Sequence, residues 1–201
     1  MRKGTLVTAL ARELAVERQN LIVECENDSE LIGLKSANCR VALGSDHGGW
    51  TLKQGLKNFL EESGYAVLDC GPESEEVVDY PDFALKVANS VRTGQAPLGI
   101  MIDGVGTGSC IVANKLPGIR AAHCYDLLTA RNSREHNDAN VLTLGGQTLT
   151  LEQGTLIVST WLNTSFAGGR HHPRVLKIEQ VEQQFLKDSI VAIGGDCSWA
   201  L

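Results

Sequence analysis

The sequence predicts an α/β protein in which a five-stranded parallel sheet is covered by helices on both faces. Two observations favour this fold class. Short apolar runs recur along the chain, and each is followed by a stretch of helical period that is about 10–15 residues long. Such alternation forms right-handed βαβ units, whose parallel strands are buried on both faces. The composition agrees, because 43% of the 201 residues are hydrophobic and 21% are charged, close to the average of globular domains.

The predicted elements follow one another from residue 39 onward. Apolar runs place strands at 41–43, 66–68, 98–102, 119–123 and 141–144. Helical periods place helices at about 50–63, 82–92, 109–115, 127–135, 152–163 and 173–187. Gly64 ends the first helix, and Pro81 stands where the first turn of the second helix tolerates proline. We therefore expect one domain over residues 39–187, followed by a short tail at 188–201.

Residues 1–38 form an extension in front of this domain. Apolar residues recur four apart within 5–18, at Leu6, Leu10 and Leu14, which predicts an amphipathic helix, whereas 19–38 lose this period and are typical of a linker. A helix of this length is not stable alone in water and needs a surface to pack on. Two interpretations stay open: the helix extends a contact within this protein or its oligomer, or it docks the chain on another protein.

The composition excludes several classes of partner. A net charge of −6 and an aromatic content of 5% argue against a nucleic-acid-binding protein. No apolar run approaches the roughly 18 residues that span a membrane, and the apolar stretch near the N-terminus stops at Arg12 without a cleavage signal. The six cysteines are scattered without a CxxC pair, which is typical of reduced thiols in a cytoplasmic protein.

Polar and titratable residues follow the predicted strands, at the edge where open parallel sheets bind ligands. Residues 45–49 (SDHGG) follow the first strand, and residues 103–109 (DGVGTGS) follow the third. The fourth strand is followed by 124–126, and the helix after it ends in 134–138 (REHND). We expect all these segments to meet at one edge of the sheet.

The glycine turn at 104–108 precedes a predicted helix. Its three glycines allow the backbone to approach an anion closely, and the helix N-terminus adds further N–H groups. The GxGxG spacing and the position after the third strand differ from the dinucleotide fingerprint, so a nicotinamide or flavin site is not indicated. A purely structural tight turn stays open as an alternative.

A second candidate segment, 168–174 (GGRHHPR), carries two arginines four residues apart. If both lie on one helix face, Arg170 and Arg174 are suited to binding a phosphate, although such a pair on its own is more often a solvated face. The adjacent His171 and His172 have no carboxylate or cysteine at ligand spacing, so no metal site is predicted.

Several short motifs occur in a fixed order: Gly44-Ser-Asp-His-Gly-Gly49, Asp79-Tyr-Pro-Asp82, Ala113-Asn-Lys115, Gly118-Ile-Arg-Ala121, Glu135-His-Asn-Asp138 with Asn140-Val-Leu142, and Gly168-Gly-Arg-His171 with Arg174-Val175. In this order they resemble the type B ribose-5-phosphate isomerases, whose wider family includes the galactose-6-phosphate isomerase subunits. The resemblance covers about residues 39–180. It implies a Rossmann-like three-layer α/β/α sandwich, a homodimer or a dimer of dimers with active sites between subunits, and neither a metal nor an organic cofactor.

The resemblance also implies roles for individual residues. His136 would open the furanose ring, Asn137 would hydrogen-bond the reacting oxygens, and the amides of the turn at 104–108 would stabilise an enediolate. These roles are chemically coherent, because aldose–ketose isomerisation removes a proton next to a carbonyl and creates an oxyanion. The catalytic set is Asp103, Gly104, Gly106, Gly108, His136 and Asn137. The substrate-binding set is Asp46, His47, Tyr80, Val105, Thr107, Ser109 and, from the facing subunit, Arg170 and Arg174.

The chain departs from the family pattern at the position of the proton-transferring base. Asp103 stands where many members place a catalytic cysteine, and Ser109 stands where another branch places a glutamate. Val105 and Gln147 replace a usual threonine and arginine. Asp103 can act as the base if burial raises its pKa, but the adjacent helix N-terminus favours the ionised form. Cys110 is the fallback.

The sequence therefore predicts an aldose–ketose isomerase of a phosphorylated sugar, with conversion of ribose 5-phosphate to ribulose 5-phosphate as the expected reaction. Galactose 6-phosphate or a tetrose phosphate is the alternative substrate, and a homologue that binds sugar phosphate without turnover is the alternative function. The helix at 5–18 resembles the encapsulation peptides that bind shell proteins of bacterial microcompartments. We thus expect a cytoplasmic enzyme, with encapsulation as an open hypothesis.

Overall fold

The computed structural model describes residues 40–193, so the helix and linker expected within 1–38 and the residues from 194 onward lie outside the description. Five strands form one sheet in the order β2-β1-β3-β5-β4, and every neighbouring pair is parallel. The predicted five-stranded parallel sheet is therefore confirmed. The strands are β1 (Arg40–Ser45), β2 (Ala66–Asp69), β3 (Leu98–Asp103), β4 (Ala121–His123) and β5 (Val141–Gly145).

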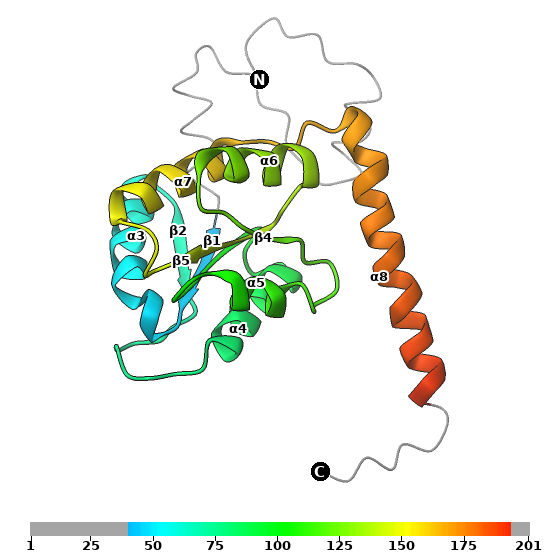
Figure 1. Cartoon of the computed structure of the whole chain (residues 1–201), viewed down its shortest axis with the longest axis horizontal. Helices are drawn as coiled ribbons and strands as arrows, with labels where there is room; N and C mark the ends of the chain where they lie inside the picture. Colours follow the sequence, from blue (N-terminus) through cyan, green and yellow to red (C-terminus); the bar gives the residue numbers. More distant parts are fainter. Residues whose placement is uncertain (1–39, 194–201) are drawn as a thin grey trace, which may run out of the picture.

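Helices cover both faces of the sheet, which confirms the predicted three-layer α/β/α sandwich (Figure 1). One face packs on α3 (Trp50–Glu62), α6 (Leu127–Asn137) and α7 (Leu151–Asn163) through a buried cluster around Leu56, Leu142 and Trp161. The opposite face packs on α4 (Tyr80–Arg92) and α5 (Thr107–Ala113) through a cluster around Val87 and Met101. Alternate residues of each strand belong to the two clusters, so both faces of a strand are apolar and its sequence is a continuous apolar run.

The last helix, α8 (His172–Ile193), runs along the side of this sandwich (Figure 1). The sequence predicted its end near residue 187 and a tail from 188. The structure continues the helix to Ile193, because helix-compatible residues extend up to the glycine pair at 194–195. Several of its large apolar side chains are exposed in the single chain, among them Leu176, Ile178 and Val181.

Two further observations bear on the sequence predictions. No helix within residues 40–193 is long and apolar enough to cross a membrane. In the same part of the chain Cys70, Cys110 and Cys124 are free thiols.

Candidate active site

Two aspartates lie side by side at the carboxyl edge of the sheet, one after β1 and one at the end of β3. The backbone N–H of Asp46 donates to the carbonyl of Ile102 at 3.0 Å, which places Asp46 beside Asp103. The Asp46 side chain caps a short 3₁₀ helix, η1 (His47–Gly49), by accepting the Gly49 N–H at 2.9 Å. The two strand ends thus bring a pair of carboxylates together, as neighbouring parallel strands require.

The carboxylate of Asp103 organises the glycine turn that follows it. Its Oδ1 accepts the N–H groups of Val105, at 2.8 Å, and of Gly106. Its Oδ2 accepts the N–H of Ser109 at 2.8 Å. Gly106 has φ 91°, and a Cβ there would lie 2.5 Å from the His123 ring, so only glycine fits. This left-handed residue starts α5 at Thr107, two residues earlier than predicted.

Some amides of the turn bind Asp103, and only the others remain available to an external anion. Three of the amides face the chain's own Asp103, which the sequence analysis did not foresee. The first N–H groups of a helix lack intrahelical acceptors, and in α5 the N–H of Cys110 bonds to the Gly106 carbonyl. Within residues 40–193, the N–H groups of Thr107 and Gly108 are thus the ones in the first turn left for an external anion.

The environments of the two carboxylates move their pKa values in opposite directions. Burial favours neutral Asp103, but the hydrogen bonds from Ser109, Gly106 and Val105 outweigh burial and lower the pKa of Asp103 below its usual range. Burial raises the pKa of Asp46, the Gly49 amide opposes the rise, and the negative charge of Asp103 adds to it. Asp103 is therefore ionised at neutral pH, and Asp46 is the member that takes up a proton more readily. Asp103 thus has the ionised form that a base needs, but the raised pKa expected of it is found at Asp46 instead.

Other predicted site residues surround the turn. The ring of Tyr80 packs on Gly108, where an added Cβ would lie 2.8 Å from it. His47 Nδ1 lies 3.2 Å from the Val78 carbonyl. Gln147 lies next to Gly104, within 3.6 Å of where its Cβ would stand. We call the set at this edge the carboxyl-edge group; it consists of Asp46, His47, Tyr80, Asp103 and residues 104–109.

The environment of Cys110, the fallback base, does not suit proton transfer. Its thiol donates to the Ala121 carbonyl at 3.4 Å and lies near the side chain of Asn114. Burial raises the pKa of Cys110, which disfavours the thiolate that a base or nucleophile needs.

His136 and Asn137 lie at the opposite edge of the sheet, so the expectation that residues 134–138 join the other segments is wrong. Asn140, just beyond α6, accepts the Gly99 N–H at the start of β3 and, through Oδ1, the Arg120 N–H just before β4. Both partners lie at the beginnings of strands. The physical reason is direction: a crossover helix returns antiparallel to the strands, so its C-terminal end reaches their amino ends.

Two imidazoles stack at this amino edge. The ring centroids of His136 and His171 are 4.0 Å apart, with an interplanar angle of 10°. Asn132 contacts His136 Nδ1 at 2.9 Å, and Arg170 Nε donates to His171 Nε2 at 3.3 Å. Burial, followed by nearby His136, Arg170 and Arg174, lowers the pKa of His171. We call His136, Asn137, Arg170, His171 and Arg174 the amino-edge group.

The sequence had suggested that the two arginines of this group lie on one helix. The structure places them in different elements. Arg170 belongs to a 3₁₀ turn, η2 (Gly169–His171), and Arg174 to the first turn of α8. Both act electrostatically on His171, so they still lie in one cationic cluster.

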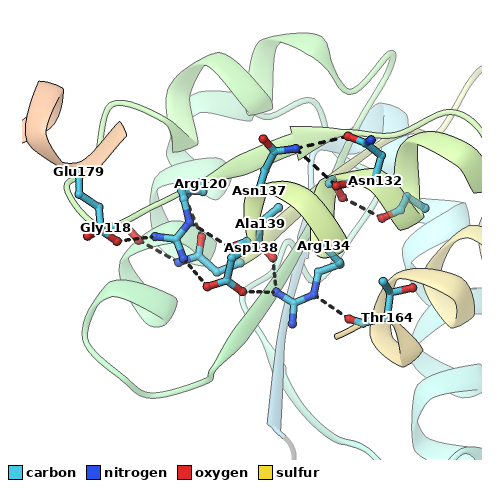
Figure 2. Close-up of polar contacts among 12 residues, drawn as sticks. Gly118, Arg120, Asn132, Arg134, Asn137, Asp138, Ala139, Thr164 and Glu179 are labelled. Carbon is cyan, nitrogen blue, oxygen red and sulfur yellow. Dashed lines mark hydrogen bonds and ion pairs between the residues drawn. The ribbon is translucent and has the colours of Figure 1, made fainter. Parts of the chain in front are cut away.

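An ion-pair network surrounds Asp138, the residue that follows Asn137 (Figure 2). Asp138 ends α6 with φ 48° and pairs through its two oxygens with Arg120 at 2.9 Å and Arg134 at 3.3 Å. Arg120 also reaches Glu179 of α8 at 3.5 Å, and Arg134 donates to the Thr164 carbonyl at 3.3 Å. The network therefore joins the ends of α6 and α7 to α8.

Replacing Asp138 should destabilise the protein, because both arginines are largely buried and would lose their shared partner. We expect Asp138→Ala to lower the free energy of unfolding by about 2–3 kcal/mol and Asp138→Asn by about 1–2 kcal/mol, since asparagine keeps the left-handed backbone at little strain. Urea unfolding measures both. An Asp138→Asn variant as stable as the natural protein would show that the pairs contribute nothing.

Residues 41–178 match the model of the family described as Ribose/Galactose Isomerase. The chain belongs to this family. It is therefore a sugar-phosphate isomerase, as the ordered motifs had indicated.

Relatives of this sugar-phosphate isomerase match over almost their whole length. The ribose-5-phosphate isomerase B of Escherichia coli K12 is 43% identical over 145 residues, which cover 72% of this chain and 97% of the relative. A D-erythrulose-4-phosphate isomerase of Pectobacterium atrosepticum is 38% identical over 146 residues, which cover 72% and 95%. The structure of the Clostridium thermocellum ribose-5-phosphate isomerase B is 51% identical, with a TM-score of 0.72, and covers 73% of this chain and 99% of that chain.

Sequence reasoning missed two members of the amino-edge environment. Asn132 carried no signal beyond being a polar residue one turn before His136. His171 belonged to a family motif but had been considered only as a metal ligand. In residues 40–193 no three His, Cys, Asp or Glu side chains are placed to hold a metal ion.

Proposed function

We propose that this isomerase interconverts ribose 5-phosphate and ribulose 5-phosphate at sites that two subunits complete together. The observation that carries this proposal is the separation of the two groups: in one chain the carboxyl-edge group and the amino-edge group lie at opposite edges of the sheet. A sugar of five carbons cannot reach both. A second copy whose amino edge faces the carboxyl edge of the first supplies the missing half.

Exposed apolar side chains support such an assembly. Leu176, Ile178 and Val181 line α8 with exposures of 42%, 47% and 57%, and Leu128 on α6 is 74% exposed. Large apolar side chains that a single chain leaves exposed are often covered by a partner, and closed two-fold dimers are the commonest oligomers. The same pairing permits a dimer of dimers.

The reaction follows from the chemistry of the two groups. His136 opens the furanose ring, and Asn137 binds the reacting oxygens. The carboxylate pair then moves the proton: ionised Asp103 accepts it from C2 of the aldehyde and returns it to C1, and Asp46 exchanges a proton with the substrate oxygens. The N–H groups of Thr107 and Gly108 stabilise the enediolate between these steps.

Arg170 and Arg174 bind the phosphate in this proposal. Arg174→Ala should raise KM about tenfold or more with a smaller change in kcat, because a charge-assisted hydrogen bond contributes about 1.5–3 kcal/mol. Steady-state kinetics on ribose 5-phosphate measures the split. Lys177→Ala, an exposed cation farther along α8, is the matched control. An unchanged KM in Arg174→Ala would remove this arginine from the site.

The choice of substrate is tested by direct comparison. We expect the largest kcat/KM for ribose 5-phosphate among ribose 5-phosphate, galactose 6-phosphate and erythrose 4-phosphate. The relative from Pectobacterium atrosepticum, named for erythrulose 4-phosphate, makes the tetrose the main competitor. Tight binding of these phosphates by calorimetry without turnover would instead favour a sugar-phosphate sensor.

We also propose that the extension at 1–38 determines where in the cell the isomerase is held. Its predicted helix at 5–18 would bind a microcompartment shell protein and bring the isomerase into the compartment. Deleting residues 1–20 should abolish co-localisation with shell proteins while isomerase activity persists; unchanged co-localisation would remove the idea.

A further inference from the structure

The side chain of Asn132 lies next to His136 and takes no part in the proposed reaction. Asn132 lies one turn before His136 on α6 and contacts its Nδ1 at 2.9 Å. We infer that Asn132 is a positioning residue, which fixes neutral His136 as the tautomer protonated on Nε2, while His171 fixes the plane of the ring. The inference deepens the proposed function, on which it rests for the role of His136 in ring opening.

The orientation of the Asn132 amide follows from its other neighbour, Asn137 (Figure 2). Asn137 Nδ2 lies 3.4 Å from the backbone oxygen of Asn132 and 3.4 Å from Asn132 Oδ1. A backbone oxygen only accepts hydrogen bonds, so the Asn137 group facing it must be the NH₂ donor. The same NH₂ then requires an acceptor at Asn132, which places Oδ1 towards Asn137 and Nδ2 towards His136.

This orientation decides the tautomer of His136. Asn132 Nδ2 carries two hydrogens and no lone pair, so it can only donate to His136 Nδ1. Nδ1 must then offer its lone pair, and the proton of the neutral imidazole resides on Nε2. The opposite tautomer would set an N–H of His136 against the N–H of Asn132.

The stacked ring of His171 completes the support. Its Nε2 accepts the Arg170 Nε–H, so His171 is itself neutral with its proton on Nδ1. Burial and the neighbouring cations lower the pKa of His171, in agreement with this state. The near-parallel contact at 4.0 Å holds the His136 ring in one plane without bringing two positive charges together.

The tautomer matters because it sets the direction of proton transfer. When the furanose opens, the bond between C1 and the ring oxygen breaks, the C1 hydroxyl loses its proton to water, and the ring oxygen must gain one. His136 Nε2–H can give that proton, which leaves the ring as an imidazolate that then takes a proton back from water. A ring protonated on Nδ1 instead presents a lone pair at Nε2 and cannot act as the acid.

The test is the tautomer of His136 in the full-length protein, read from imidazole ¹⁵N shifts and assigned with His136→Gln. We expect the Nε2–H form in the natural protein. Asn132→Asp should convert it to the Nδ1–H form, because a carboxylate only accepts hydrogen bonds. If Asn132→Asp does not fold, Asn132→Ala replaces it and should populate both tautomers. Arg131→Ala, an exposed neighbour on α6, should leave the spectrum unchanged.

Kinetics provides the second readout. Asn132→Asp should lower kcat on ribose 5-phosphate by about 100-fold with little change in KM, as expected for a misdirected group that does not bind the substrate. A natural protein with His136 in the Nδ1–H form, or a tautomer unmoved by Asn132→Asp, would overturn the inference. Should the tautomer change as expected in a chain that turns over none of the three sugar phosphates, the inference about Asn132 stands and the proposed function fails.

Discussion

Replacing Asp103 by asparagine should lower isomerase turnover by about 1000-fold or more. Asparagine cannot accept a proton from carbon. It also disrupts the turn. If its Oδ1 accepts the N–H groups of Val105 and Gly106, its NH₂ faces the N–H of Ser109, and two donors then oppose each other. The loss should fall on kcat in assays with ribose 5-phosphate. Near-native turnover would show that Asp103 neither carries the proton nor holds the turn.

The same variant has a stability signature that depends on pH. A carboxyl group whose pKa is lowered in the folded state stabilises the protein above its unfolded pKa, and this contribution is lost as the pH falls through the folded value. Asp103→Asn should therefore be less stable than the natural protein by about 1–3 kcal/mol at neutral pH. The gap should narrow in acid, below the ordinary value of 3.8. Glu61→Gln, an exposed carboxylate on α3, is the control for both measurements.

Replacing His136 by alanine should lower kcat/KM for ribose 5-phosphate by about 100-fold to 10,000-fold, because general acid catalysis of ring opening is lost. Ribose 5-phosphate is mostly cyclic, whereas the later steps need the open aldehyde. The variant then depends on ring opening in solution. Its rate should stop rising with enzyme concentration once that uncatalysed step is limiting, whereas the rate of the natural protein should stay proportional to enzyme.

His172→Ala is the matched control for this experiment. His172 is an exposed histidine next to the amino-edge group, and the centroid of its ring lies 6.5 Å from that of Phe166. It should behave like the natural protein. A rate in His136→Ala that keeps rising in proportion to enzyme would show that another group opens the ring.

The sheet, the strands to within about two residues at each end, and the helices that cover the sheet could be predicted from periodicity, because strands buried on both faces leave continuous apolar runs. The start of α5 could not, since it depends on a left-handed Gly106 whose N–H is accepted by the Asp103 carboxylate. Hydrophobic patterning does not record such a local side-chain interaction. The end of α8 was placed too early for a simpler reason: the breaking signal is the glycine pair at 194–195.

The candidate site could be predicted as a set of residues but not as an arrangement. The motifs singled out Asp46, Asp103 and His136 as candidate site residues, yet a list of segments does not say at which edge of the sheet each residue lies. The C-terminal end of α6 reaches the amino edge of the sheet because the helix runs back along the strands. Asn132 could not be predicted, because its inferred role depends on its contact with His136 one turn later, which residue types alone do not specify.

If each active site takes its carboxyl-edge group from one subunit and its amino-edge group from another, two inactive variants should complement each other. Co-refolding Asp103→Asn chains with His136→Ala chains tests this most directly. Each variant alone should be nearly inactive. In a hybrid dimer, one of the two sites receives both intact groups, so random mixing should restore about a quarter of the natural activity. Activity that stays at the sum of the two separate variants would contradict a shared site and place the whole reaction within one chain.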